Sequence, residues 1–356
     1  MDTITNKNNR YIWVDVIKGL AILLIMFGHV HSSSPFKTYI SSFHVPIFFV
    51  VSGVLLSIKD SQYDRRNFLF NTVRKNITPY LYFSICAIII NIFFYYMYDR
   101  GNTLSVTLQG VYHTIILFGI DALWFIPSYL IAYRLFYLLK SKWQYSLIGF
   151  LAFLAVTVIL SKFVLYGGYE YSNLTYHLVK EPIILISRSL TGACFILAGY
   201  FLVKLYKRIM LSDYMIAIMG VLLIGINIVL TYFIGSVNFS MADLGKYPFM
   251  TYLNGFCGTF AYILIIYAFR KITNHFRFLA FCGKNSLILM CSHMSLKLVF
   301  ISEFILGHIF YYDTSNILHG ILATVIMILI ELPIIYLLNG PLKFVLGKKP
   351  RSETKQ

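Results

Sequence analysis

The chain has 356 residues, of which 58% are hydrophobic and only 12% are charged, and its formal net charge is +16. Because a soluble domain carries about 25% charged residues, this composition excludes a mainly soluble protein and predicts an all-α polytopic membrane protein. A strongly positive charge can indicate nucleic-acid binding. Here the basic residues are concentrated in every second connection between apolar segments. This pattern is typical of membrane topology, so we expect no nucleic-acid partner.

The first apolar segment, residues 12–31, is long enough to cross a bilayer and contains three ionisable side chains. Asp15 and Lys18 lie one turn apart, and the eleven-residue step from Lys18 to His29 brings these two within about 20° on a helix. Charged groups in hydrocarbon are costly, so this polar stripe should face protein or a hydrated cavity. Histidine is the natural general base near neutral pH. The structural alternatives are a snorkelling Lys18 and an interfacial, hydrogen-bonded His29.

The second apolar segment, residues 40–58, begins near His44 at the predicted outer face. Since the connection before it is short, the first two helices should be neighbours, and His44 should lie at a depth similar to that of His29. A metal site made of His29, His31 and His44 lacks a nearby carboxylate or cysteine to complete it. We therefore expect no metal.

A basic segment precedes the third apolar segment and contains Arg66, Arg74 and Lys75. The structural interpretation is an anchor on the cytoplasmic side of the membrane. The functional alternative is a clamp for the phosphates of an acyl-CoA, because arginine suits bidentate phosphate contacts.

Further side chains could bind ligands or face the interior. Asp121 and Trp124 form a suitable sugar-binding pair, since the ring can stack on a sugar while the carboxylate accepts hydroxyl protons; the alternative for Trp124 is an aromatic belt at the membrane interface. Arg134 and Arg188 lie within predicted spans and should face the bundle interior. His293 lies about two turns inside the ninth predicted span.

Ten segments are long enough to span a bilayer. They are residues 12–31, 40–58, 79–98, 123–139, 146–165, 183–203, 214–234, 248–268, 286–309 and 317–338. The stretch 104–119 is shorter and is interpreted as a re-entrant or interfacial helix, with an eleventh span as the alternative. With ten spans, the predicted inner connections hold most Lys and Arg residues, which places both termini in the cytoplasm. Residues 1–342 are then one transmembrane domain, and 343–356 a basic cytoplasmic tail.

Four motifs in one order resemble the membrane acyltransferase family 3, the integral membrane O-acyltransferases of bacterial surface polysaccharides. They are Lys18-Gly19 followed by Gly28-His29, the segment FHVPIFFVVSG at 43–53, the segment LWFIP at 123–127, and GKNS at 283–286 with His293. The match covers nearly the whole chain. The motifs are most similar to the fucose 4-O-acetylase-like branch.

The resemblance implies a ten-helix core in the bacterial inner membrane and an acyl-CoA donor, usually acetyl-CoA, with no bound cofactor. It also implies transfer to a sugar hydroxyl of a glycan or lipid-linked oligosaccharide, such as O-antigen lipopolysaccharide, capsule or exopolysaccharide. The basic surface adds contact with membrane lipid. An exporter or flippase of polysaccharide or lipid-linked sugar is the alternative from another class.

By their positions in the motifs, the resemblance implies that His29 is the catalytic histidine and that Lys18 is its basic companion, with Asp15 on the same stripe. Arg74 and Lys75 lie near the family's cytoplasmic Arg-x-x-Arg motif. Asn71 stands in the place of the first arginine of that motif.

Overall fold

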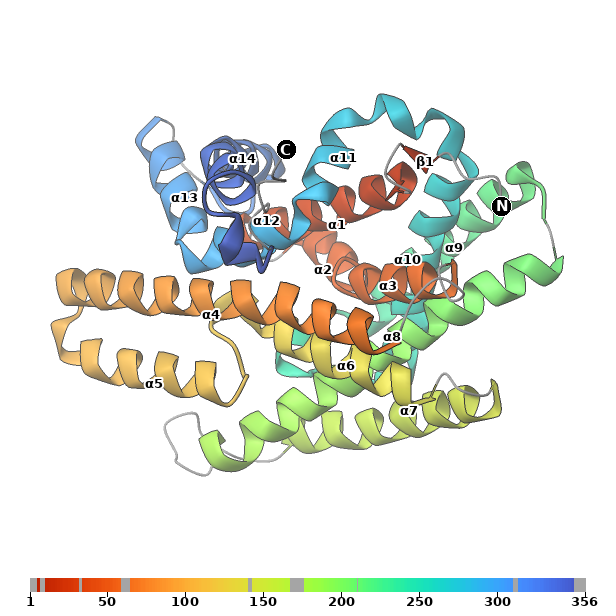
Figure 1. The fold of residues 1–356 in the computed structure, drawn as a ribbon, viewed down its shortest axis with the longest axis horizontal. Helices are drawn as coiled ribbons and strands as arrows, with labels where there is room; N and C mark the ends of the chain where they lie inside the picture. The colour runs from red at the N-terminus through yellow and green to blue at the C-terminus, as the bar shows by residue number, and fades with distance from the viewer. Residues whose placement is uncertain are drawn as a thin grey trace, which may run out of the picture. The chain divides into compact units, whose positions relative to one another are not determined.

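The structure, a computed structural model, describes residues 5–6, 10–31, 34–58, 65–139, 143–166, 176–209, 211–309 and 313–348 (Figure 1). Within this part of the chain, nine helices are long and apolar enough to cross a membrane, and a bent helix pair supplies a tenth span if it is counted as one. The predicted all-α polytopic membrane protein is therefore confirmed. The direction in which the termini face stays a prediction.

The long helices follow the predicted order, but their first and last residues differ from the predicted ones. The helices are α1 (Ile12–Val30), α2 (Pro35–Ser41), α3 (Pro46–Ile58), α4 (Arg65–Tyr98), α5 (Thr103–Ile115), α6 (Phe125–Leu139), α7 (Trp143–Tyr166), α8 (Glu181–Ile209), α9 (Asp213–Ile234), α10 (Pro248–Ala268), α11 (Arg277–Lys284), α12 (Ser286–Ser295), α13 (Leu298–Ile309) and α14 (Ile317–Asn339). Short turns of helix are η1 (Arg100–Asn102), η2 (Asp121–Trp124), η3 (Tyr176–Lys180), η4 (Phe239–Met241), η5 (Arg270–His275) and η6 (Lys343–Leu346). Two-residue strands, β1 (Thr5–Asn6) and β2 (Arg10–Tyr11), pair near the N-terminus.

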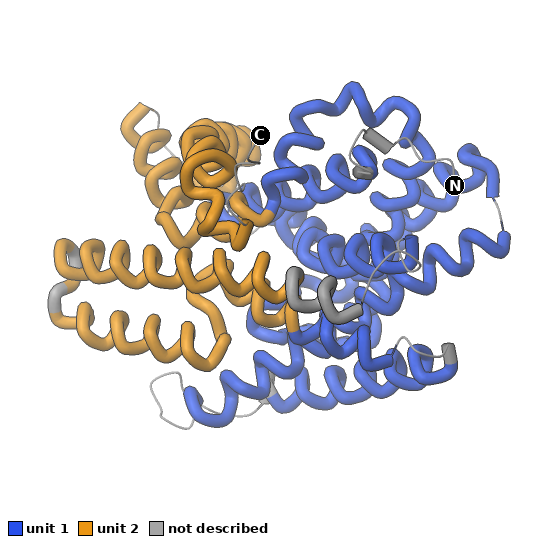
Figure 2. The backbone as a smooth tube through the Cα atoms, in the orientation of Figure 1, with its two compact units in different colours: residues 1–60, 131–286 blue, residues 61–130, 287–356 orange. Residues whose placement is uncertain are grey.

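The chain folds into two compact units, and each unit is built from two separate stretches of sequence (Figure 2). Unit 1 comprises residues 1–60 and 131–286, and unit 2 comprises residues 61–130 and 287–356. In unit 1, the close helix pairs are α1 with α11, α3 with α8, and α9 with α10. In unit 2, α4 packs on α5, and α13 packs on α14.

Glycine allows α1 and α11 to pack backbone against backbone. A Cβ atom at Gly19 would meet the carbonyl oxygen of Leu279, and one at Gly283 would meet the carbonyl oxygen of Asp15. Small residues at such crossings let membrane helices approach closely, because lipid tails provide little hydrophobic drive for association. This crossing fixes the helix that carries Asp15, Lys18 and His29.

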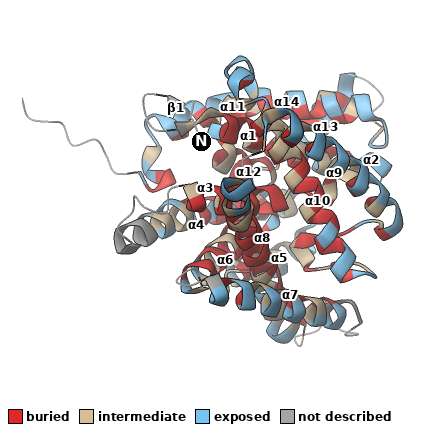
Figure 3. Cartoon of the chain, turned by 90° about the vertical axis from the view of Figure 1, so that its right-hand side faces the viewer, coloured by how far each residue is buried: buried red, intermediate tan, exposed pale blue. Residues whose placement is uncertain are grey.

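The same device joins α3 to α8. A Cβ atom at Gly53 would meet the carbonyl oxygen of Ile196, and one at Gly199 would meet that of Val50. In α8, 78% of the most apolar stretch is buried, against 22% in α7 and in α9, so α8 is an inner helix (Figure 3). The exposed apolar side chains of α7 and α9 suit contact with lipid.

The start of α3 lies deeper than predicted. The carbonyl oxygen of Ser42 is 3.3 Å from the position of a Cβ atom at Gly255, and Cβ of Phe43 is 2.8 Å from that at Gly258. Both glycines lie in the middle of α10 (Pro248–Ala268). Helices α2 and α3 together form one candidate span, Pro35–Ile58, so α3 itself begins inside the bundle, and the face at which the span opens stays a prediction.

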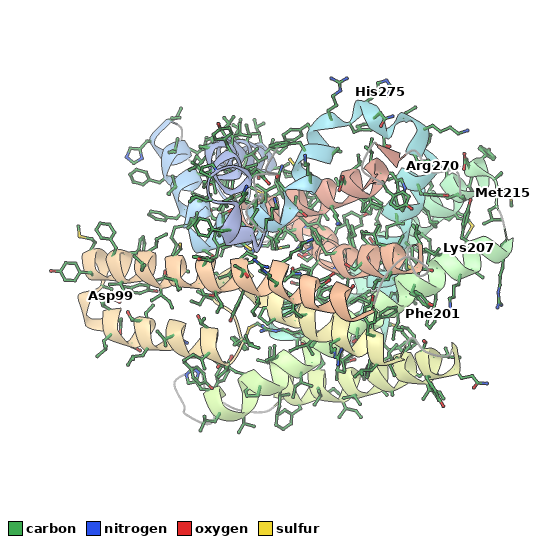
Figure 4. The ribbon with its side chains drawn as sticks, in the orientation of Figure 1. Asp99, Phe201, Lys207, Met215, Arg270 and His275 are labelled. Carbon is green, nitrogen blue, oxygen red and sulfur yellow. The ribbon has the colours of Figure 1, made fainter. Side chains whose placement is uncertain are left out.

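The helix α5 pairs with α4 in unit 2. The hydroxyl of Tyr80 donates to the carbonyl oxygens of His113 at 3.3 Å and Thr114 at 3.0 Å, which ties the end of α5 to α4. Asp99, labelled in Figure 4, marks the turn between the two helices, where its carboxylate accepts a 2.7 Å hydrogen bond from Asn102. With 13 residues, α5 is shorter than the roughly 17 that a span needs. This length supports the re-entrant or interfacial helix over an eleventh span.

The last described segment packs on α4 and α14. Gly347 adopts φ +63°, and a Cβ atom there would lie 2.7 Å from the carbonyl oxygen of Arg74. Val345 and Leu346 are buried. Residues 343–348 of the predicted basic tail thus pack against α4 and α14, and the remainder of that tail lies outside the described residues.

Two connections that were predicted on one side of the membrane meet in unit 1. Arg270, at the turn after α10, donates a 2.6 Å hydrogen bond to Asp213, the first residue of α9 (Figure 4). At the same end, the ring of Trp13 lies 5.1 Å from that of Tyr267 in an edge-on arrangement. These contacts place the start of α1, the start of α9 and the end of α10 together, as the predicted topology requires.

Candidate functional site

The polar stripe of α1 is present, and its members differ in burial. Asp15 is buried, Lys18 is half-buried, and His29 keeps an exposed side chain at the end of a helix that is otherwise mostly buried. The backbone of Asp15 lies against Gly283 of α11. A single rigid helix therefore positions all three residues, and His29 is the accessible one.

Histidine and lysine side chains gather at the end of α1. His29 and His44 lie within electrostatic range of one another, and Lys37 of α2 lies within range of both. The predicted proximity of His29 and His44 is confirmed. Lys37 was not among the predicted site residues; its signal in the sequence is its position in the short connection between two histidine-bearing segments.

Hydrogen bonds fix the orientation of His44. Its Nδ1 lies 2.6 Å from the carbonyl oxygen of Ile40, and because a carbonyl only accepts, Nδ1 carries the proton. In the neutral ring, Nε2 then carries the lone pair. Nearby, Nε2 of His31 and the hydroxyl of Ser34 are 2.8 Å apart. The absence of a metal at these histidines stays a prediction.

A buried amide network supports this region. The side chain of Asn227 on α9 donates to the hydroxyl of Ser42 at 3.1 Å, and the side chain of Asn254 on α10 donates to Thr231 at 3.0 Å. Asn227 and Asn254 are also hydrogen-bonded to each other. These hydrogen bonds link α9 and α10 to the segment before His44, while the buried Oδ1 of Asn227 has no hydrogen-bond partner among the described residues.

The second set of predicted residues lies in unit 2. Asp121 forms an ion pair with Lys297, with 3.5 Å between Oδ2 and Nζ. Trp124 lies in the same turn η2 and packs edge-on against Phe125. His293 is fully buried, and its Nδ1 donates to the carbonyl oxygen of Leu289 at 2.6 Å. Lys297, within the ninth predicted span, was not among the predicted site residues.

A buried serine and glutamate form a hydrogen-bonded pair in unit 2. The hydroxyl of Ser292 on α12 lies 2.6 and 2.8 Å from the two carboxylate oxygens of Glu331 on α14. Both side chains are fully buried. Ionisable residues in membrane spans are rare enough that Glu331 marks a place of structural or functional importance.

The predicted interior arginines differ. Arg188 is buried and donates a 3.2 Å hydrogen bond to the carbonyl oxygen of Ser240, as expected. Arg134 is exposed, so its predicted interior position is wrong. The buried face of α6 is formed instead by Ala132, Tyr133 and Phe136. Because Arg134 lies near the end of α6, its long side chain can reach the membrane surface.

The predicted donor-binding residues lie at the start of α4. Arg74 is half-buried and Lys75 is exposed. The side chain of Arg66 lies outside the described ones. The two described cations are accessible to an anionic ligand, and their role stays a prediction.

The helices define an integral membrane protein whose ionisable side chains cluster on or beside its spans. Residues 11–336 match the model of the acyltransferase domain, and the chain therefore belongs to membrane acyltransferase family 3. The comparisons with curated proteins and with solved structures found no match. The fucose 4-O-acetylase-like branch stays a prediction, because the matching model describes the family as a whole.

Proposed function

We propose that this membrane acyltransferase moves an acetyl group from acetyl-CoA to a sugar hydroxyl of a cell-envelope polysaccharide, such as O-antigen, capsule or exopolysaccharide, in the bacterial inner membrane. The observation that carries the proposal is His29, an accessible imidazole on a buried helix, with His44 and Lys37 beside it. Family membership supports acyl transfer over the exporter alternative.

His29 acts as the general base. Its imidazole takes the proton of the acceptor hydroxyl while the hydroxyl oxygen attacks the thioester carbonyl. The C–S bond breaks, and the departing CoA thiolate takes the proton back from the imidazolium. The products are a sugar ester and free CoA, and this chemistry needs no bound cofactor.

Other polar side chains bind and orient the two substrates. Lys18 and Asp15 order water or donor groups along α1, and His44 offers its Nε2 lone pair to an acceptor hydroxyl. Arg74 and Lys75 of α4, with Arg66, bind the phosphates of the donor at the cytoplasmic face.

The first prediction concerns His29. In membranes given radiolabelled acetyl-CoA, we expect His29→Ala to lower glycan acetylation about 10²- to 10⁴-fold, the usual contribution of a general base. His275→Ala is the matched control, since His275 is an exposed histidine of η5 that bonds a backbone carbonyl. Normal acetylation by well-expressed His29→Ala protein would contradict the proposal.

A further inference from the structure

The predicted ninth span is broken at its centre. Helices α12 and α13 meet at an angle of 68°, and Lys297 lies between them with φ +57°. A lysine is uncommon in the left-handed region, because its Cβ atom approaches the following carbonyl. The amide of Lys297 still bonds the carbonyl of Met294, and its carbonyl accepts from the amide of Ile301. The break is thus a formed structure with its own hydrogen bonds.

A second irregular segment, residues 116–124, carries the partner of Lys297. Leu117, Gly119 and Asp121 all adopt positive φ angles, of 61°, 86° and 47°. The amide of Gly119 bonds the carbonyl oxygen of His113, and Leu123 of the same segment is fully buried. The tight loop therefore holds Asp121 in a defined place after the short helix α5.

The ion pair between these segments keeps accessible surface. The side chain of Lys297 is 27% exposed and that of Asp121 is 28% exposed, whereas Glu331 in the same unit is fully buried. Charged side chains and irregular backbone are not tolerated against lipid tails; they occur where they are buried in protein or line hydrated cavities. Because this pair is not buried, its accessible surface should face water inside the span.

The charges indicate which ligand suits the pair. The ammonium of Lys297 is already balanced by Asp121 at 3.5 Å, so an anionic ligand would meet the carboxylate and gain little. A neutral polyol fits better, since one hydroxyl can donate to Asp121 while another accepts from Lys297. The ring of Trp124, half-buried in the same turn, offers an aromatic face to a sugar.

We propose that Lys297 and Asp121 form a hydrated binding site for a neutral, hydroxyl-rich ligand, namely the sugar of the acceptor. This proposal rests on the proposed function for the identity of the sugar, and it adds Lys297 as a residue that determines acceptor binding. The site is open to water whether or not transfer occurs at His29.

The first arm of the test measures access of water. In a Cys86→Ser background, which removes the exposed native cysteine, Lys297→Cys is compared with Phe300→Cys in lipid nanodiscs. Phe300 lies three residues away and is 42% exposed, so it is the matched control for a lipid-facing position. We expect a charged methanethiosulfonate reagent to label Lys297→Cys at least tenfold faster. Equal or slower labelling would overturn the proposal.

The second arm measures acceptor binding. The probe is the glycolipid fraction extracted from membranes of a strain that lacks the gene. We expect Lys297→Met and Asp121→Asn each to raise the KM for this fraction about tenfold, with the KM for acetyl-CoA unchanged. Lys348→Met is the control, because Lys348 is an exposed lysine of unit 2 that bonds Asn339. An unchanged KM for the fraction would overturn the proposal.

The two arms distinguish a failure of the binding-site proposal from a failure of the proposed function. A wild-type protein without transferase activity refutes the proposed function, and the labelling rates then decide the binding site alone. A fully active His29→Ala variant refutes the role of His29 and leaves both arms valid.

Discussion

At the scale of single residues, the Ser292 hydroxyl occupies an unusual position. Its oxygen lies 2.7 Å from the carbonyl oxygen of Ile288 and within 2.8 Å of both carboxylate oxygens of Glu331. Among the described residues, Ser292 is the hydrogen-bond partner of Glu331. A buried polar group that loses its partner costs about 1–3 kcal/mol, so this hydroxyl supports α14 as well as its own helix.

We therefore expect Ser292→Ala to lower the free energy of unfolding by about 1–3 kcal/mol, because it leaves the Glu331 side chain without a partner. Glu331→Gln should cost less, since an amide still bonds the Ser292 hydroxyl. Thermal unfolding in detergent measures both variants. A larger loss for Glu331→Gln than for Ser292→Ala would show that the hydrogen bond is not what stabilises this pair.

Periodicity alone predicted part of the site. The spacing of Lys18 and His29 placed them on one helix face, and the short connection predicted the approach of His44. Nothing local predicted the pairing of Asp121 with Lys297, because neither glycine nor proline marks the break at Lys297 and the two residues are far apart in sequence. Arg134 was misplaced because α6 is apolar around most of its surface, so the sequence does not show that its buried face is the one with Ala132, Tyr133 and Phe136.

At the scale of helices, Gly19 and Gly28 of α1 allow a matched comparison. A Cβ atom at Gly19 would collide with the backbone of α11, whereas one at Gly28 would find only a side-chain methyl of Ile40, at 3.8 Å. The first glycine is required by packing, and the second has room for a methyl group.

We expect Gly19→Ala to destabilise the protein by about 1–3 kcal/mol, the usual cost of overpacking. Gly28→Ala should be neutral or stabilising by up to about 1 kcal/mol, because alanine restricts the unfolded chain. Stability of the purified variants against denaturing detergent measures the difference. Equal stabilities would mean that α1 and α11 separate easily at Gly19.

Helix existence was easier to predict than helix geometry. Apolar length identified the spans, and the modest length of 104–119 set it apart. The depth at which α3 begins depends on contacts with the middle of α10 at Gly255 and Gly258, which are tertiary and leave no local pattern. The extension of α4 back to Arg65 follows from its own residues, since charged side chains continue a helix readily beyond the apolar stretch.

At the scale of the whole molecule, the distribution of basic residues predicts the orientation of the chain. The connection after α9 should face outward, and the turn after α10 should face the cytoplasm. Ser236 and His275 are exposed positions in these two connections. They allow a direct measurement of sidedness.

In intact cells, we expect an impermeant maleimide to label Ser236→Cys and to spare His275→Cys until the membrane is permeabilised. The background again carries Cys86→Ser, so that the exposed native thiol does not contribute. The opposite pattern would reverse the predicted orientation. Labelling of both positions in intact cells would contradict the prediction that α10, which lies between them, crosses the membrane.

The number of spans could be predicted from sequence, but the division into two units could not. The unit boundary near residue 130 falls inside the apolar segment 123–139, where composition does not mark it, because the hydrophobic requirement of a bilayer is the same in both units. Which spans pack together depends on small residues and polar pairs whose partners lie elsewhere in the chain.

The composition of unit 2 from residues 61–130 and 287–356 has a consequence for biogenesis. The ribosome makes Asp121 long before Lys297, so the carboxylate lacks this counter-ion while residues 131–286 of unit 1 are synthesised. An intramembrane charge in that state is costly and would hold its segment in a provisional position. Release of the finished chain then completes the ion pair, which makes assembly of this unit a late step in the maturation of the protein.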